Sequence, residues 1–405
     1  MTDQFVGTPV VHETSVRFPG LERWLQRVLC IGLVWLIVGM AVMPAGVSYD
    51  PGHAYQYVLG VTLYLPALLL VALRPGSVQV LWRQPSTKWV LLLLAWGAMS
   101  LLWSNARHPA SGVARDLSIL LFLYGWARVT DGFERRIPRI LMGCGAAMAV
   151  VALVAMFVFR SQLLPGGRLM GFGVMHNANL AAAAMAAAAL WLCAFPCQAP
   201  AQRVGRALAA AVLLLFVFMT FTRSAWGALF LALLVMAACR PGSRTRRHVA
   251  WMILLAAVVA VVGMPELTAR GWSMRPEILQ RSWELFAHHP WFGLGQGAVF
   301  RIDVGDMVLT HAHNMFSQLA IELGLPGLLL WLGTWFALGW RGWLNRREPL
   351  GRLVLATWVF ATIMTQFDLP HLLASPRPAW LITWLPLAIG YSLKPLPASA
   401  ASNPS

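Results

Sequence analysis

The chain has 405 residues, of which 59% are hydrophobic and only 11% are charged. Soluble globular domains carry about 25% charged residues, so this composition excludes an ordinary soluble protein. The formal net charge is +16, but the basic residues form short clusters between apolar runs, a pattern that argues against a nucleic-acid partner. We predict an all-α, polytopic integral membrane protein surrounded by membrane lipids.

Apolar runs close to the roughly 20 residues that a helix needs to cross a bilayer recur along the whole chain. They predict about twelve transmembrane helices, joined by short connections except for one long outward loop that contains short helices. The predicted spans are residues 25–43, 54–73, 89–103, 112–127, 137–159, 178–195, 207–221, 225–238, 249–264, 315–340, 350–367 and 380–391.

These spans divide the chain into consecutive parts. A cytoplasmic segment, residues 1–24, precedes the first nine spans in residues 25–264, and a large outer loop follows in residues 265–314. Residues 315–394 hold the last three spans, and residues 395–405 are expected to be a disordered tail. Because mostly polar residues precede the first apolar run, we interpret that run as a retained span and not as a signal peptide.

The basic residues set the orientation of the spans. With both termini in the cytoplasm, 21 of the 31 Arg and Lys residues lie on the inner side, and every inner segment carries some of them. This distribution obeys the positive-inside rule. The same orientation puts eight of the ten histidines on the outer side, so we expect the chemistry of the protein at its outer face.

The cysteines predict neither a disulfide framework nor a metal site. All of them lie within or beside predicted spans, and no pair falls on the outer loops, so small buried side chains are the favoured role. They are Cys30, Cys144, Cys193, Cys197 and Cys239.

The long outer loop begins with the signature of a helix start. Ser273, then Pro276 in a first-turn position and then Glu277 have the spacing typical of a helix N-terminus. The apolar stripe of this helix is Leu279, Trp283 and Phe286. Such a helix either lies on the bilayer surface or caps the bundle.

A stretch that alternates glycine with other residues follows at residues 288–297. It lacks the Lys-Ser/Thr of a P-loop and follows no clear strand, so a nucleotide-binding site is disfavoured. We expect a tight turn that presents backbone N–H groups.

The loop ends in a pair of histidines, His311 and His313, followed by Asn314. Asn314 is a suitable N-cap for the next span, which places both imidazoles at the positive end of a helix dipole. Free N–H groups there favour an anion and keep an imidazole neutral, as a general base requires. The alternative is a pair of interfacial histidines that hydrogen-bond to loop carbonyls.

Several arginines also lie at the outer face. Arg223 occupies a hairpin so short that it must lie at the outer boundary of two spans, although an Arg that only reaches toward headgroups would lie there too. Arg275 begins the loop helix, where the alternative is a solvated charge or an ion pair. Arg168 precedes the sixth predicted span, while Arg115 and Asp116 are expected to form a structural ion pair.

Five motifs, in this order and around one long outer loop, resemble the O-antigen ligase/O-antigen polymerase superfamily. The likeness extends over about residues 165–330, and the helix count outside that region also agrees. The motifs are Arg223-Ser224, the helix over residues 275–283, and residues 289–295, 311–314 and 322–327.

The resemblance implies a glycosyltransferase without metal or other cofactor at the periplasmic face of a Gram-negative inner membrane. Ligases of this kind move a glycan from undecaprenyl diphosphate to the lipid A–core oligosaccharide. Polymerases extend the glycan instead, and relatives pass it to protein hydroxyls. We favour an inverting O-antigen ligase, because the chain has one large outer loop and not two.

A transporter of lipid-linked glycans is the alternative from another class. It predicts charged residues along a path through the membrane, whereas here the charged residues are concentrated at one face. The residues themselves do not decide which of His311 and His313 is the base.

By the family's pattern, His313 is the general base, and Arg223 and Arg275 clamp the diphosphate of the donor. Neighbouring polar residues then orient the base or a phosphate. The predicted supporting residues are His311, Asn314, Arg301 and Arg168.

Overall fold

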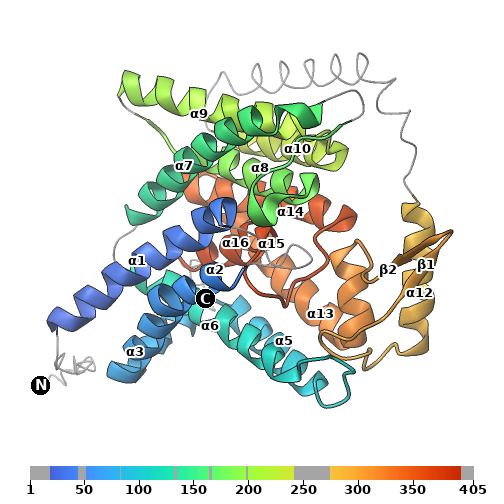
Figure 1. Ribbon diagram of the computed structural model, residues 1–405. Helices are drawn as coiled ribbons and strands as arrows, with labels where there is room; N and C mark the ends of the chain where they lie inside the picture. Colours follow the sequence, from blue (N-terminus) through green and yellow to red (C-terminus); the bar gives the residue numbers. More distant parts are fainter. Residues whose placement is uncertain are drawn as a thin grey trace, which may run out of the picture.

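The computed structural model describes residues 19–43, 52–82, 84–131, 135–163, 167–197, 199–240 and 274–393. These residues form a bundle of α-helices, with α12 and a two-stranded ribbon at one edge beside α13 (Figure 1). The α-helices are α1 (Pro19–Val42), α2 (His53–Leu59), α3 (Leu65–Leu73), α4 (Gln79–Trp82), α5 (Ser86–Ser100), α6 (Pro109–Thr130), α7 (Arg136–Val158), α8 (Ala178–Ala194), α9 (Pro200–Met219), α10 (Arg223–Ala238), α12 (Arg275–His288), α13 (Met315–Leu344), α14 (Pro349–Phe367), α15 (Pro378–Ile382) and α16 (Trp384–Gly390).

Shorter elements complete the fold. A π-helical turn, η2 (Gly60–Tyr64), joins α2 to α3, and the two strands, β1 (Ile302–Val304) and β2 (Met307–Leu309), pair antiparallel. The 3₁₀ turns are η3 (Pro75–Val78), η4 (Arg160–Leu163) and η5 (Gly173–Met175).

The prediction of an all-α polytopic membrane protein is confirmed. Within the described ranges, six helices are long and apolar enough to cross a membrane, and shorter apolar helices accompany them. Eleven of the twelve predicted spans coincide with helices. The ninth, residues 249–264, lies outside the described residues.

Helix α8 lies at the centre of the bundle. Its alanine-rich run, residues 181–189, is completely buried, and α7, α9, α10 and α14 all pack against it. Small side chains let the backbones of neighbouring helices approach closely, which is how helices associate in a bilayer. The centre of the bundle therefore gives a rigid support to whatever lies at the end of α8.

Helix α13 differs from the uninterrupted span predicted over residues 315–340, because it breaks at Gly324, whose φ is 64° and ψ is −168°. The break leaves carbonyl groups of the preceding turn without partners in the helix. Leu294 N–H donates to the carbonyl of Ile321, and Gly295 N–H donates to that of Glu322, each at 2.8 Å. The glycine-rich turn therefore presents backbone N–H groups, as predicted, and the carbonyl groups of α13 accept them.

The loop helix α12 begins with Pro276 in its first turn, as predicted, but its N-cap is Met274 and not Ser273. One face of α12 buries Ile278 against β1 and α13, while Leu279 and Trp283 stay exposed on the other. The helix therefore caps the bundle and also turns most of the predicted apolar stripe outward. The ribbon of β1 and β2 was not expected, because the loop was predicted to contain only short helices.

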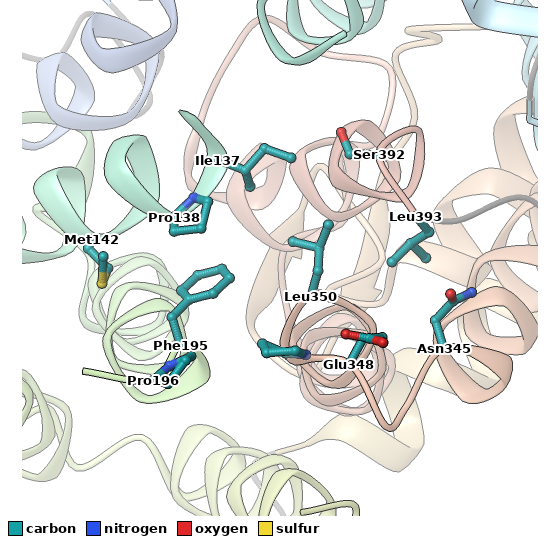
Figure 2. A pocket seen from close by; sticks show the side chains of 11 residues that line it. Ile137, Pro138, Met142, Phe195, Pro196, Asn345, Glu348, Leu350, Ser392 and Leu393 are labelled. Atoms are coloured by element: carbon teal, nitrogen blue, oxygen red, sulfur yellow. The ribbon is translucent and has the colours of Figure 1, made fainter. Parts of the chain in front are cut away.

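An apolar cavity of about 330 Å³ lies at the opposite end of the bundle from the histidine motif. Figure 2 shows Pro138, Phe195 and Leu350 around it, with Glu348 and Leu393 nearby. These residues lie at or beside the span ends that were predicted to face the cytoplasm, so their proximity agrees with the predicted alternation of the spans. Its apolar lining offers little to the chemistry expected at the outer face.

The glycine at the α13 break should be irreplaceable. A Cβ on Gly324 would collide with the carbonyl group of Trp291, and its backbone conformation is open essentially to glycine alone. We expect Gly324→Ala to lower the free energy of unfolding by more than about 2 kcal/mol. Gly143→Ala is the matched control, since a Cβ there meets open space. Equal thermal unfolding of the two variants in detergent would contradict this account.

Candidate active site

The candidate site is built around the end of α14. That helix ends at Phe367, and Asp368 follows as its C-cap. Side chains from α8, α12 and the segment before α13 converge on residues 366–368. This short segment thus joins parts of the chain that are far apart in the sequence.

The carboxylate of Asp368 is buried and receives several polar groups. Nδ1 of His313 lies 3.6 Å from its Oδ1, Asn179 Nδ2 donates to Oδ2 at 2.6 Å, and the Leu369 N–H donates to Oδ1 at 2.9 Å. Burial acts to raise the pKa of Asp368, but His313, Asn179 and the Leu369 N–H together hold it below its ordinary value. The group is therefore an anion at neutral pH.

Arg168 holds this network in place through hydrogen bonds to its neighbours. Its guanidinium donates to Asn179 Oδ1 at 2.6 Å, to Thr222 Oγ1 at 2.8 Å and to the carbonyl of Thr220 at 2.9 Å. Asn179 belongs to the first turn of α8, and Thr222 immediately precedes Arg223. Arg168 thus fixes Arg223's neighbour and the amide that holds Asp368.

Arg275 lies near this carboxylate, and Arg223 lies near Arg275. Arg275 Nη1 donates to the Phe367 carbonyl, and its Cζ lies 5.3 Å from the centre of the Phe367 ring. Burial lowers the pKa of Arg275, the charge of Asp368 opposes this, and the charge of Arg223 lowers it further. Arg223 is the first residue of α10. The two arginines are therefore close enough to repel each other, which creates a site for an anion.

Asn314 caps α13, as predicted. Its Oδ1 accepts from the N–H groups of Phe316 at 2.9 Å and Ser317 at 3.1 Å. The same side chain donates through Nδ2 to the carbonyl of Gln366 at 3.2 Å and to its Oε1 at 3.1 Å. One amide therefore starts α13 and ties it to the end of α14, which keeps His313 beside Asp368.

Two more imidazoles lie in a row with that of His313. The ring of His311 is centred 4.1 Å from that of His313 and 5.5 Å from that of His371. Burial, with the neighbouring positive groups, lowers the pKa of His311 to about 4 and that of His371 to about 3. Both rings are therefore neutral at physiological pH and can hold or accept a proton.

The backbone is strained next to each of these groups. Strain of this kind costs about 1–3 kcal/mol per residue and clusters at functional sites. Leu369 follows Asp368, Met274 precedes Arg275, Phe221 lies two residues before Arg223, and the remaining strained residue is His313 itself. In the described ranges, the non-glycine residues with positive φ are Phe221 (49°), Met274 (54°), His313 (49°) and Leu369 (63°).

The structure brings most of the predicted site residues together. They are Arg168, Arg223, Arg275, His311, His313 and Asn314. Arg301 is not among them: it is exposed and lines a separate cavity of about 330 Å³ with residues of α12, such as His288. The expected ion pair of Arg115 and Asp116 is also replaced, because Asp116 Oδ1 accepts from Gln296 Nε2 at 3.0 Å.

Sequence reasoning missed Asp368 and His371. One signal for them existed, because Asp368 directly follows a predicted span, at a helix C-terminus where the dipole disfavours an anion. A charged residue in so unfavourable a place indicates a specific partner. That partner, His313, is 55 positions away in the sequence, so the pairing itself was invisible.

The family comparison bears on the same region. A family model described as O-antigen ligase matches residues 208–332, which include Arg223, Arg275 and His313. An O-antigen ligase of Pseudomonas aeruginosa is 27% identical over 385 residues, covering 92% of this chain and 91% of that protein. The chain is therefore similar to O-antigen ligases, over residues 208–332 to the family model and over most of its length to the Pseudomonas protein. The resemblance found in the sequence is thereby confirmed, and with it the class of enzyme, a glycosyltransferase.

The network extends beyond the region that the family model matches. Arg168 and Asn179 precede residues 208–332, and Asp368 follows them. The alignment to the Pseudomonas protein covers almost the whole length of both chains. In this chain, the matched segment therefore supplies Arg223, Arg275 and His313, while the flanking segments supply the groups that hold them.

Acidification should destabilise the fold through His311. Its pKa is lowered from 6.5 to about 4, so between these values the unfolded chain binds a proton that the folded chain does not. The contribution of His311 to the free energy of unfolding is then fully present above pH 6.5 and decreases as the pH falls toward 4. We expect the unfolding temperature of His311→Gln to fall less than that of the wild type between pH 7.5 and pH 5. His108→Gln, at an exposed position, should behave as wild type; a wild-type fall in His311→Gln would refute this.

Proposed function

We propose that this protein is an O-antigen ligase that moves a glycan from undecaprenyl diphosphate to a hydroxyl of the lipid A–core oligosaccharide. The observation that carries the proposal is the convergence of two arginines and a carboxylate-bound imidazole, His313, at one end of the bundle. Such a site can bind a diphosphate and deprotonate a hydroxyl. The name of the Pseudomonas relative supports the choice of ligase.

In this reaction His313 acts as the general base. It takes the proton of the acceptor hydroxyl while the oxygen attacks the anomeric carbon of the donor sugar. Asp368 lies beside Nδ1 of His313, so it orients the ring and stabilises the imidazolium that forms. That leaves Nε2 for the acceptor. General base catalysis of this kind contributes about 10²–10⁴-fold.

Arg223 and Arg275 act on the leaving group. The bond between the anomeric carbon and the phosphate oxygen breaks as the new glycosidic bond forms, and the lipid diphosphate leaves with the electron pair. Guanidinium forks match phosphate oxygens and stabilise the charge that grows on them. Because attack and departure occur on opposite sides of the carbon, the configuration is inverted. The donor already carries its leaving group, so the chemistry needs neither a nucleotide site nor a metal.

The proposal places the site in the periplasm of a Gram-negative bacterium, with twelve spans and both termini in the cytoplasm. The basic residues of the inner loops support this orientation, as does the location of every site residue at predicted outer ends. Residues 265–314 would then form a periplasmic loop between two membrane parts, residues 25–264 and 315–394. Residues 1–18 and 394–405 lie outside the described residues, and α1 begins at Pro19, within the segment that was predicted to precede the first span.

Two related activities use the same chemistry. An O-antigen polymerase would offer a second donor-linked glycan as the acceptor, and a protein O-oligosaccharyltransferase would offer a peptide hydroxyl. A non-enzymatic transporter is a weaker candidate, because it has no use for a general base.

The choice of acceptor tests the proposal directly. Purified protein with undecaprenyl-diphosphate glycan should extend lipid A–core, but neither a second donor glycan nor a peptide, when products are followed by gel and mass spectrometry.

Addition of a metal chelator should leave the rate of transfer unchanged. His313→Ala should lower the rate by about 10²–10⁴-fold. Transfer only to another acceptor would replace the ligase assignment, and near-normal transfer by His313→Ala would remove the base.

Asp368→Asn distinguishes positioning from a merely structural role in the same assay. It should lower kcat with little change in the KM for either substrate, because an amide beside Nδ1 cannot stabilise the imidazolium that forms during the reaction. An unchanged kcat with a raised KM would argue against this role.

The arginine forks provide the second test. Arg275→Lys should lower the rate by about tenfold or more, because a point charge reproduces neither the bidentate geometry nor the contact with Phe367. Arg301→Lys is the matched control, since Arg301 lies in the other cavity, and it should keep the wild-type rate. Equal rates for both variants would contradict the clamp.

A further inference from the structure

A cavity of about 500 Å³ lies between α2, η2, α6 and the loop that follows α14. Its size falls within the range of sites for small ligands. Its lining is rich in hydroxyl, amide, imidazole and guanidinium groups, which neither the helix packing nor the proposed chemistry explains. They belong to His53, Gln56, Tyr57, Tyr64, Arg115 and Ser118.

Tyr64 is the clearest sign that the cavity receives a ligand. Its hydroxyl is buried and forms no hydrogen bond of normal geometry with a described residue, although the Ser118 hydroxyl lies within interaction distance and a buried polar group is normally paired. The nearby Ser118 hydroxyl donates instead to the carbonyl of Arg115 at 2.6 Å. Tyr64 ends the π-helical turn η2, and turns of this kind occur frequently at functional sites because the extra residue redirects side chains.

The cavity connects to the candidate active site through one loop. Ser375 and Pro376 line the cavity, while His371 of the same loop lies against His311, which in turn lies against His313. His371 is also within electrostatic reach of Arg115. His311 and His371 thus lie between His313 and the cavity, whereas Arg275 lies near Asp368 and Arg223 lies near Arg275.

We propose that this cavity binds the acceptor glycan, as a polyhydroxylated sugar that carries a phosphate or carboxylate. This inference rests on the proposed function. The Arg115 guanidinium would donate two parallel hydrogen bonds to the anionic substituent. The Tyr64 hydroxyl would hydrogen-bond to a sugar hydroxyl, and the exposed Tyr57 ring would pack against a face of the sugar. The base then lies between the acceptor and the diphosphate, as direct displacement requires.

Two variants test the assignment in full-length protein in lipid nanodiscs. Tyr64→Phe removes only the unpaired hydroxyl, so it should keep the wild-type unfolding temperature and raise the KM for lipid A–core by about threefold to tenfold. Arg115→Gln should raise that KM by about tenfold or more. The KM for undecaprenyl-diphosphate glycan should stay unchanged in both.

Tyr55→Phe is the matched control. The Tyr55 hydroxyl donates to the carbonyl of Leu36 at 2.8 Å, so its loss should lower the unfolding temperature without a change in acceptor KM. A rise in donor KM instead would assign the cavity to the donor glycan, and an unchanged KM for both substrates would exclude a substrate site. Either result overturns the proposal.

Binding of core oligosaccharide, measured by calorimetry, separates this inference from the proposed function. If wild-type protein transfers nothing yet binds the oligosaccharide, and Tyr64→Phe and Arg115→Gln bind it more weakly, the cavity assignment stands while the ligase assignment fails. If wild-type protein does not bind the oligosaccharide, the cavity assignment fails.

Discussion

A buried carboxylate at a helix C-terminus is the constraint on which the arrangement of the candidate site depends. Desolvation and the helix dipole both oppose a negative charge at Asp368, so donors from other elements must surround it. Asn179 at the start of α8 and His313 before α13 meet this need. Arg275 binds the adjacent carbonyl. The cost of one unfavourable charge therefore brings together groups that would otherwise have no reason to meet.

The break in α13 supports this assembly from the other side. The carbonyl groups of Ile321 and Glu322 accept N–H groups from the glycine-rich turn, and Trp96 Nε1 donates to the carbonyl of Leu323 at 2.8 Å. Both the long loop and α5 are thus held to α13 by backbone carbonyl groups that a continuous helix would have used internally. The break in α13 therefore stabilises the fold and also holds the loop that carries site residues.

Much of the fold could be predicted, because hydrophobic runs and Arg clusters are local signals that the bilayer imposes. The Asn314 cap and the Pro276 helix start were predictable for the same reason. The break at Gly324 and the ribbon were not, since both depend on contacts between distant segments. Within the site, the arginines and His313 could be named from motifs, whereas Asp368 and the misplaced Arg301 show that spacing alone does not reveal which groups share a pocket.

The components of the site are distributed from Arg168 to Asp368, across most of the polypeptide. During synthesis the site arginines are made first. Asp368 is made only after α14, near the end of the chain. Until then the imidazole lacks its partner, and the loop lacks the backbone that anchors it. An incomplete chain therefore cannot assemble the site and consume its lipid-linked substrate prematurely.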